Sequence, residues 1–296
     1  NRISASIGGT CLTLMLNRRG TIEGEATIAR LADDQFYLVT GAPSERRVWD
    51  WLTLHCGVPM DGLELINQTD NVGILTLAGP RARDVLAACS DDDVSNAAFG
   101  WLKARQVTVA GIACCALRLS FTGELAYELH VPNNRLGQLW DALWSAGQAH
   151  GIGAFGSKAL DSLRLEKFYR GGHELSNDAS HKDVDQLRFA KVDKDFVGKD
   201  AMLAREPRSK IALLALDGET TDCLIGEAVL MGDEPVGSVT SAAYGHTVGK
   251  SLAIAFLPDQ ARVPGTRLEI SLFGERVSAV VLEDAPHDPG NVRLKV

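Results

Sequence analysis

Acidic side chains alternate along one predicted strand near the start of the chain. Glu23 and Glu25 lie two residues apart in the segment 21–28, and Thr27 follows at the same spacing. Because side chains of a strand alternate between two faces, these three polar groups share one face. A carboxylate there can accept a proton from an amine or orient one. The same pattern also fits an acidic face in contact with solvent, and the sequence leaves both interpretations open.

A second carboxylate lies on a predicted strand among aromatic residues. Glu128 belongs to the segment 120–131, which also carries Phe121 and Tyr127. In this setting a carboxylate can accept two parallel hydrogen bonds from the ring N–H and the amino group of a heterocycle. It can equally be a charge on an edge strand, and again the sequence does not decide.

A charged helix is predicted over residues 161–167. Its pattern leads us to expect that Leu160 and Leu163 face inward, with Arg164 and Glu166 pointing elsewhere. Asp161 lies three residues before Arg164, a spacing at which helical side chains of opposite charge meet. A local ion pair is therefore expected for this arginine.

Neither the glycine-rich stretch at 151–156 nor the set of cysteines predicts a binding site. Residues 151–156 read G-x-G-x-x-G, but they follow a predicted helix, whereas the dinucleotide-binding fingerprint follows a strand. We expect these glycines to end that helix. The six cysteines include no C-x-x-C pair and have no histidines clustered beside them, so no metal site is predicted. Cys114 and Cys115 are expected to pack as small hydrophobic residues of a strand, and a reducing compartment follows by default.

The elements that must position these residues follow from periodicity. A hairpin is predicted from segments 21–28 and 35–40, with helices over 44–54 and 81–89. A strong amphipathic helix follows Pro132, and its periodic apolar positions include Trp140 and Trp144, both expected in the core. Short strands then predict an antiparallel sandwich or barrel after a linker at 205–210. They are segments 211–216, 228–231, 251–256, 267–272 and 276–282.

Composition limits the possible functions. The chain has 296 residues, a mass of 31.8 kDa and a formal charge of −8, with a sequence pI near 5.4. This length allows two or three domains, and the acidic balance argues against a nucleic-acid partner. No apolar run approaches 18 residues, so no membrane association is expected. The sequence starts without Met or a signal-like core, which leads us to expect a trimmed or processed chain lacking an N-terminal portion.

A family resemblance emerges around the predicted charged helix. Residues 160–170 resemble the SLRLEK signature of the glycine-cleavage T-protein (aminomethyltransferase) superfamily, and within it the chain is most similar to the folate-binding C-terminal portion of dimethylglycine and sarcosine dehydrogenases. Further segments resemble the family in the same order along the chain. They are residues 15–23, 79–82, 121–128, 195–201 and 240–253.

The resemblance implies an α+β fold. It is the three-lobed, cloverleaf-like aminomethyltransferase fold with a C-terminal antiparallel β-barrel or sandwich, truncated in its N-terminal part. We expect residues 1–205 to form the folate-binding region, as two interleaved α+β lobes that are incomplete at the N-terminus. Residues 206–296 are expected to form the C-terminal barrel domain.

The resemblance also implies tetrahydrofolate chemistry. A one-carbon unit released from a small methylated amine is captured by the folate as 5,10-methylene-tetrahydrofolate. Glu25 matches the family's catalytic carboxylate, an Asp there, and Glu128 its pterin-holding glutamate. Phe121 and Leu12 stand where the family has aromatic hydroxyls. The expected folate contacts are Glu128, Phe121, Thr27, Tyr244, Tyr169 and Arg164.

Three functions remain open at this point. The first is the folate-binding portion of a demethylating amine dehydrogenase or oxidase, with FAD on an absent N-terminal domain or a partner flavoprotein subunit. The second is a folate-dependent S- or O-demethylase or methyltransferase. The third is a folate-binding or regulatory module that has lost its catalysis. The expected location is the cytoplasm, or the mitochondrial matrix in a eukaryote.

Overall fold

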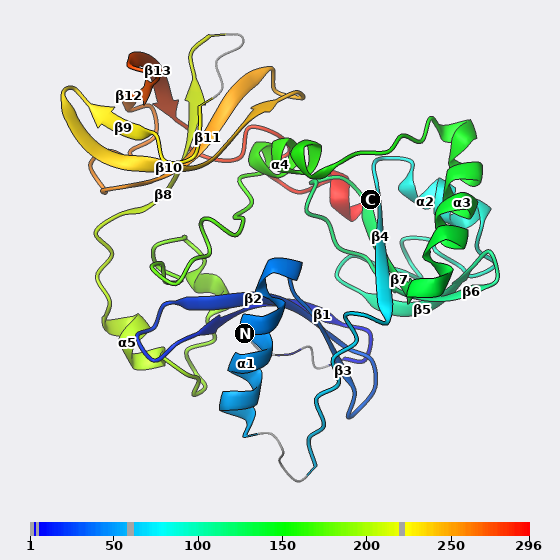
Figure 1. Cartoon of the computed structure of the whole chain (residues 1–296). Coiled ribbons are helices and arrows are strands. Elements are labelled where there is room, and N and C mark those ends of the chain that lie inside the picture. The colour runs from blue at the N-terminus through cyan, green and yellow to red at the C-terminus, as the bar shows by residue number, and fades with distance from the viewer. Residues whose placement is uncertain (1–2, 4–5, 58–61, 219–222) are drawn as a thin grey trace. The chain divides into compact units, whose positions relative to one another are not determined.

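The structure is a computed structural model that describes residues 3, 6–57, 62–218 and 223–296. Its contacts divide the chain into two compact units, which we describe separately (Figure 1). The first unit comprises residues 1–13, 26–155 and 291–296, and the second comprises residues 14–25 and 156–290. The division into domains 1–205 and 206–296 stays a prediction.

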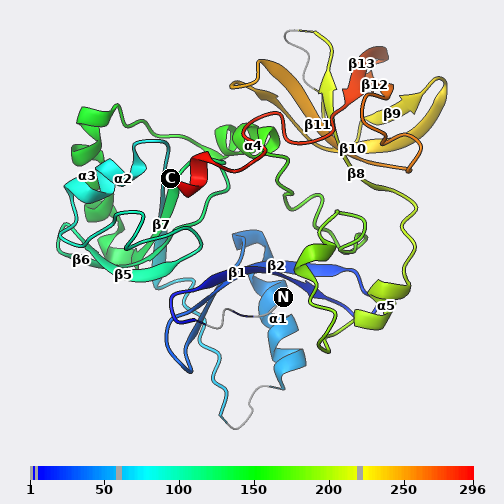
Figure 2. The same cartoon turned by 180° about the vertical axis from the view of Figure 1, so that it is seen from behind.

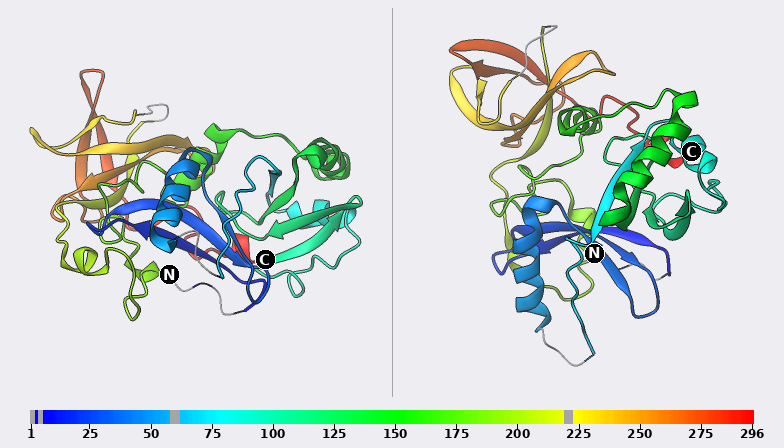
Figure 3. Two further views of the ribbon diagram at one scale, coloured as in Figure 1. Left: turned by 60° about the horizontal axis from the view of Figure 1, so that its bottom comes forward. Right: turned by 45° about the vertical axis from the view of Figure 1, so that its right-hand side comes forward.

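The first unit is built on a four-stranded antiparallel sheet. Its strand order is β4 (Val72–Ala78), β7 (Ala126–Pro132), β6 (Ile112–Leu117), β5 (Ala104–Val109). Helices α2 (Ala82–Ala88) and α3 (Leu136–Gly147) cover one face of this sheet, as Figure 3 shows. Alternate residues of β7 pack under these helices in the main core of the unit. Neighbouring residues of β7 therefore point to the opposite face.

The two tryptophans of α3 lie outside this core, contrary to the sequence prediction. Leu139 and Leu143 are buried, whereas Trp140 and Trp144 are 44% and 37% exposed. Their rings stack with centroids 5.5 Å apart. Because the helix advances about 100° per residue, the stripe that faces the sheet follows the leucines. The tryptophans, one position further on, stand at the edge of that stripe and cover each other.

A three-stranded sheet with the order β1-β2-β3 includes the predicted hairpin. Its strands are β1 (Thr10–Leu16), β2 (Ile22–Arg30) and β3 (Phe36–Val39). The β2–β3 pairing sets Thr27 opposite Val39 and Ala29 opposite Tyr37. Helix α1 (Glu45–Cys56) follows, as predicted, and ends at Gly57, whose left-handed conformation suits a glycine. The hairpin and this helix confirm the local sequence analysis.

The second unit contains a closed antiparallel barrel with the order β10-β11-β8-β13-β12-β9, which Figures 1 and 2 show from opposite sides. Its strands are β8 (Lys210–Leu216), β9 (Ala228–Met231), β10 (Glu234–Gly245), β11 (Lys250–Leu257), β12 (Arg267–Leu272) and β13 (Glu275–Val281). The predicted C-terminal barrel is confirmed. Strand β10 was not predicted, although it is the longest of the six at 12 residues.

Helix α4 (Ser157–Glu166) packs on the outside of the barrel. Leu165 lies in a core cluster with Ile211 and Ile254, which belong to β8 and β11. The opposite faces of the same strands fill the barrel interior. Strand β8 is thus covered on both sides, which explains its continuous apolar sequence.

The inward face of α4 differs from the sequence prediction. Arg164 and Glu166 are buried, whereas Leu160 and Leu163 are partly exposed. The alternation of apolar and charged residues predicts the wrong face because polar groups from the loops and β10 receive these charges. A buried charge is tolerated where such partners satisfy it.

Short elements complete the fold. Gly151 adopts a left-handed conformation where the segment after α3 ends, and Gly156 immediately precedes α4. The G-x-G-x-x-G stretch thus follows helical structure, as expected from the sequence, and forms no strand-to-helix phosphate loop. The remaining elements are α5 (Lys199–Ala204) and the 3₁₀ turns Ala42–Ser44, Asn133–Arg135, Gln148–His150, Leu187–Phe189 and Arg293–Lys295.

The cysteines behave as the sequence predicts. Cys114 is fully buried in β6, and Cys115 is partly buried beside it. The six cysteines all lie in the described ranges, and none of them forms a disulfide bond. Within the described ranges, no helix has the length and hydropathy needed to cross a membrane.

Candidate functional site

Glu128 lies in the middle of β7, an interior strand of the first unit's sheet. Thr76 of β4 and Leu117 of β6 lie opposite it on the two neighbouring strands. Its side chain is on the face away from α2 and α3 and is 31% exposed. An interior strand holds its backbone on both sides, so Glu128 is not the edge-strand charge that the sequence left possible. The backbone of Glu128 is therefore held by two neighbouring strands, and its carboxylate is accessible to solvent.

Two side chains that the sequence analysis did not select stand beside Glu128. His130 Nε2 lies 3.3 Å from Glu128 Oε2, and His130 Nδ1 lies 3.1 Å from the Tyr37 hydroxyl. The Tyr37 and His130 rings meet edge to face. Burial, and secondarily the nearby Cys115 and Glu128, raises the pKa of Tyr37 to about 12. The spacing of His130 from Glu128 signals a shared face, but nothing local in the sequence points to Tyr37.

Phe121 lies in the loop that leads into β7 and is 41% exposed. The loop is ordered by short polar contacts, including Gly123 N–H donating to the Ser120 hydroxyl at 3.0 Å. Thr122 is buried next to the exposed ring. The structure therefore presents an aromatic surface at this position, without a hydroxyl.

The paired acids of β2 have different surroundings. Glu23 accepts a hydrogen bond from the Asn17 side-chain amide at 2.8 Å, and the same amide group reaches the Thr21 hydroxyl. Glu25 is partly buried, and this burial raises its pKa to about 7. Thr27 pairs with Val39 further along the strand. Glu25 is therefore able to exchange a proton near neutral pH.

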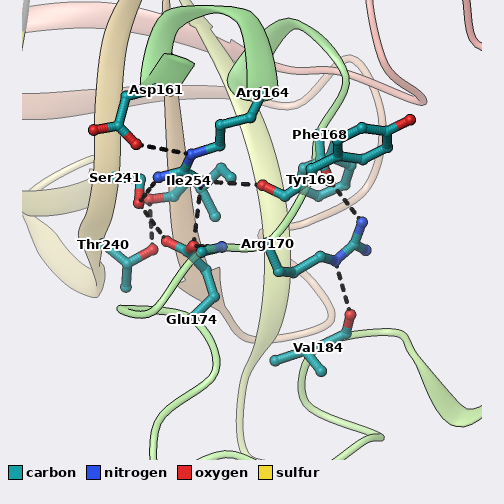
Figure 4. A network of polar contacts seen from close by, with 11 residues as sticks. Asp161, Arg164, Phe168, Tyr169, Arg170, Glu174, Val184, Thr240, Ser241 and Ile254 are labelled. Atoms are coloured by element: carbon teal, nitrogen blue, oxygen red, sulfur yellow. Dashed lines mark hydrogen bonds and ion pairs between the residues drawn. The ribbon is translucent and has the colours of Figure 1, made fainter. Parts of the chain in front are cut away.

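Arg164 anchors a buried polar network in the second unit (Figure 4). Its Nε donates to Asp161 at 3.2 Å, which confirms the predicted local pair. Its Nη1 contacts Glu174 Oε2 at 3.3 Å, and its Nη2 donates to the Ser241 hydroxyl at 2.7 Å. Ser241 in turn donates to Glu174 Oε1 at 2.6 Å. These contacts tie α4 to strand β10.

The same arginine fixes the turn that follows α4. Arg164 Nη1 donates to the Tyr169 carbonyl at 3.0 Å, so two of the expected site residues are in contact. Burial raises the pKa of Tyr169 to about 12, with a smaller contribution from Asp288. Arg170 donates to the carbonyls of Phe168 and Val184, and burial lowers its pKa to about 10. Figure 4 shows this second guanidinium beside the turn.

Tyr244 lies near the end of β10, in a segment that α4 holds in place. The Tyr244 carbonyl accepts a hydrogen bond from the Ser162 hydroxyl at 2.6 Å. Glu166 Oε1 accepts from the backbone N–H groups of Thr247 and Val248, at 2.6 and 3.1 Å. The Tyr244 ring packs edge to face against His246. The buried Glu166 thus orders the turn after Tyr244. The sequence did not reveal this role, because its pattern predicted that Glu166 points away from the core.

The expected site residues therefore fall into separate groups. Glu128, Phe121 and Thr27 belong to the first unit, and Glu25, Arg164, Tyr169 and Tyr244 to the second. Sequence analysis missed His130 and Tyr37 in the first unit, and Glu174, Ser241 and Glu166 in the second. No group of three or more His, Cys, Asp or Glu residues in the described parts of the chain could hold a metal ion.

Comparison with known proteins places these residues in a family. Residues 1–194 match the family described as the GCVT N-terminal domain, and residues 210–288 match the glycine cleavage T-protein C-terminal barrel domain. Among solved structures, that of the glycine cleavage system aminomethyltransferase T from Bartonella henselae superposes with a TM-score of 0.82. It is 23% identical and covers 95% of this chain and 76% of that one, which shows the same fold.

Curated relatives of two kinds are similar to this chain. Mitochondrial dimethylglycine dehydrogenase of Homo sapiens is 33% identical, and the match covers 94% of this chain but 33% of that protein. Aminomethyltransferase of Symbiobacterium thermophilum is 31% identical, with 94% and 76% covered. The chain thus spans about a third of the length of the dehydrogenases it matches. With family matches over both regions and a common fold, the chain belongs to the glycine cleavage T-protein family of aminomethyltransferases.

Proposed function

We propose that this chain binds tetrahydrofolate and captures on it a one-carbon unit released from a small methylated amine, giving 5,10-methylene-tetrahydrofolate. Membership of the aminomethyltransferase family supports a one-carbon transfer. The similarity to dimethylglycine and sarcosine dehydrogenases supports a methylated amine as the donor. The observation that carries the chemical step is the near-neutral carboxyl of Glu25.

Glu25 is proposed as the group that moves protons. When a folate amine attacks formaldehyde or an equivalent iminium carbon, a C–N bond forms and the amine loses a proton. Closing the methylene bridge removes a second amine proton and breaks the bond from the carbon to its leaving group, which departs as water from formaldehyde or as the demethylated amine from the iminium. A carboxyl with a pKa of about 7 can take the amine proton and deliver it to the leaving group at physiological pH. A solvated glutamate, ionised far below pH 7, would be a poor acid in the second half of this exchange.

Glu128 is proposed as the group that holds the pterin ring. The 2-amino group and adjacent ring N–H of a pterin present two parallel donors, and a carboxylate accepts two such bonds with both oxygens. Glu128 offers a partly exposed carboxylate on an interior strand. A carboxylate that is fixed by the sheet and accessible to solvent can orient such a ring.

The other expected folate contacts are also proposed. Phe121 offers an exposed ring on which a flat heterocycle can stack. Thr27, Tyr169 and Tyr244 carry hydroxyls on ordered backbone. The Arg164 guanidinium already contacts Asp161, Glu174 and Ser241, so its proposed contribution is to order the turn carrying Tyr169. FAD is proposed for another domain or a partner flavoprotein subunit.

A rate measurement tests the proposed proton transfer. We expect the purified chain to accelerate formation of 5,10-methylene-tetrahydrofolate from formaldehyde and tetrahydrofolate above the buffer rate in stopped-flow experiments. Glu25→Gln should slow this enzymatic rate by about 100-fold or more while leaving the Kd for tetrahydrofolate nearly unchanged. Removing the titrating group abolishes the proton transfer but preserves the side chain's shape.

The matched control is Glu23→Gln on the same strand. Its amide oxygen can still accept from Asn17, so its rate should equal that of the wild type. Equal rates for wild type and Glu25→Gln would contradict the proposed role. If wild type gives only the buffer rate while binding tetrahydrofolate, the chain is a folate-binding module without this catalysis.

A further inference from the structure

We propose that Tyr37 and His130 form a hydrogen-bonded chain that fixes the carboxylate of Glu128, making both of them positioning residues for the ligand that Glu128 holds. The three groups come from strands β3 and β7, and they lie in contact within the first unit. That the ligand is a reduced folate rests on the proposed function. The chain of hydrogen bonds itself rests on the geometry alone.

The direction of each hydrogen bond follows from the chemistry of its end groups. An ionised carboxylate can only accept, so His130 Nε2 must carry the hydrogen that points to Glu128 Oε2. In a neutral imidazole the other nitrogen, Nδ1, is then an acceptor. Tyr37 must therefore donate its hydroxyl hydrogen to Nδ1. The raised pKa of Tyr37, about 12, keeps that hydroxyl protonated and able to donate.

Burial locks the middle of this chain and leaves its end accessible. The His130 side chain is 1% exposed, whereas the Glu128 side chain retains about a third of its exposure. Cys115 and Ile74 lie opposite His130 on the two adjacent strands, so the backbone that carries the ring is held on both sides. A buried ring with both nitrogens paired has one tautomer and one orientation, as metal-binding histidines do when a second hydrogen bond fixes them. Tyr37 supplies that second bond.

The consequence is a carboxylate held ready for two donors. The His130 N–H occupies one acceptor position on Oε2, which leaves Oε1 and the rest of Oε2 to receive N–H groups. Holding the carboxylate plane in place before the ligand arrives lowers the entropy lost on binding. Loss of Tyr37 or His130 should therefore weaken binding without removing any atom that touches the ligand.

The first test is spectroscopic and requires no ligand. In ¹⁵N-histidine-labelled protein, we expect the His130 signals at pH 7.5 to show a protonated Nε2 and an unprotonated Nδ1. Tyr37→Phe should shift the Nδ1 signal or mix the tautomers, because the donor that selects the tautomer is gone. A protonated Nδ1 in the wild type, alone or in a doubly protonated ring, would overturn the proposed direction of the chain.

The second test measures affinity for tetrahydrofolate by calorimetry. Tyr37→Phe is expected to raise the Kd about three- to tenfold, the effect of one lost hydrogen bond between neutral groups. His130→Leu should weaken binding more, whereas His130→Gln, which keeps an N–H donor at the ε position, should restore part of the loss. Tyr127→Phe is the matched control, since its buried hydroxyl has no hydrogen-bond partner among the described residues and its ring packs in the opposite core.

The outcomes separate this inference from the proposed function. If Glu128→Ala weakens tetrahydrofolate binding but Tyr37→Phe and His130→Leu do not, the positioning role is wrong while the proposed function stands. If wild type does not bind tetrahydrofolate, the proposed function fails, and the tautomer measurement still decides whether the hydrogen-bonded chain exists. Equal losses in Tyr37→Phe and the Tyr127→Phe control would assign the effect to packing and overturn the inference.

Discussion

Burial shifts the pKa values of two groups in the second unit. The two shifts make the free energy of unfolding change with pH in opposite directions. Burial raises the pKa of Glu25 to about 7 and lowers the pKa of His181 to about 4. A buried acid with a raised pKa weakens folding as pH rises, whereas a buried base with a lowered pKa weakens folding as pH falls. Their effects partly cancel between about pH 4.5 and 6.5, so each must be measured by difference from its own variant.

The Glu25 effect has a definite sign. Below pH 4.5 the glutamate is protonated in both the folded and the unfolded chain, so Glu25→Gln should have nearly the wild-type free energy of unfolding. Between about pH 4.5 and 7 the glutamate is ionised in more of the unfolded chains than of the folded ones, so the wild type loses stability as the pH rises through this range. At pH 8, Glu25→Gln is expected to be more stable by up to about 3 kcal/mol.

Urea unfolding at pH 4.5, 6 and 8 measures this difference. The Glu23→Gln variant is the control, because that residue is hydrogen-bonded to Asn17 and lies on the same strand. A stability difference for Glu25→Gln that does not grow with pH would show that Glu25 is not held neutral by burial.

At the residue scale, the sequence spacing identified Glu23 and Glu25 as candidate acids but could not predict the raised pKa of Glu25. Glu23 and Glu25 look alike on an alternating strand, and only their surroundings separate an amide-bound carboxylate from one with a near-neutral pKa. The Arg164–Asp161 pair was predictable because helix geometry sets it locally. The contact between Arg164 and Glu174 was not predictable. It belongs to a network that Ser241, on the distant strand β10, helps to form.

At the element scale, strand β10 shows what periodicity overlooks. It carries Pro235, Gly237 and several small residues, so it has no apolar alternation by which to recognise it. It nevertheless pairs with β9 on one side and β11 on the other. A glycine is required at position 237 by close packing, since a Cβ there would lie 2.1 Å from the Phe256 carbonyl oxygen.

A substitution at Gly237 tests this close approach. Gly237→Ala should destabilise the protein by about 1–3 kcal/mol, because the backbone of β11 must move to admit the methyl group. Gly137→Ala in α3 is the matched control: nothing lies within 4 Å of its Cβ position, and alanine favours the helix by about 0.5–1 kcal/mol. Thermal unfolding of both variants gives the comparison. A neutral Gly237→Ala would contradict the packing of β10 on β11.

Helices α3 and α4 show a different limit of sequence analysis. Both were predicted as helices at nearly the observed positions, but the two tryptophans of α3 and the buried face of α4 were predicted wrongly. Periodicity identifies a helix through its apolar residues, yet it cannot separate a tryptophan in the core from one at the edge. Nor does it reveal that loops and strands will pair with Arg164 and Glu166 and make their burial favourable.

At the scale of the whole molecule, the chain enters each unit more than once. Residues 14–25 join the second unit because Leu16 and Ile22 pack with Ala179 and Met202. Residues 291–296 return to the first unit, where buried Arg118 donates to the carbonyl of Leu294. The composition of a segment does not show that it packs with a distant part of the chain. The family resemblance could therefore predict the fold and the barrel, but the division into two units could be seen only in the tertiary contacts.

Calorimetric titration with tetrahydrofolate tests whether this chain holds a reduced folate through Glu128. The wild type is expected to give a saturable isotherm with one site per chain. Glu128→Ala should raise the Kd about tenfold or more, the effect of losing hydrogen bonds to a charged group. Glu124→Ala, which removes the same charge from the preceding loop where it pairs with Arg293, should bind as the wild type does. The absence of saturable binding, or an unchanged Kd in Glu128→Ala, would show that Glu128 does not hold a reduced folate.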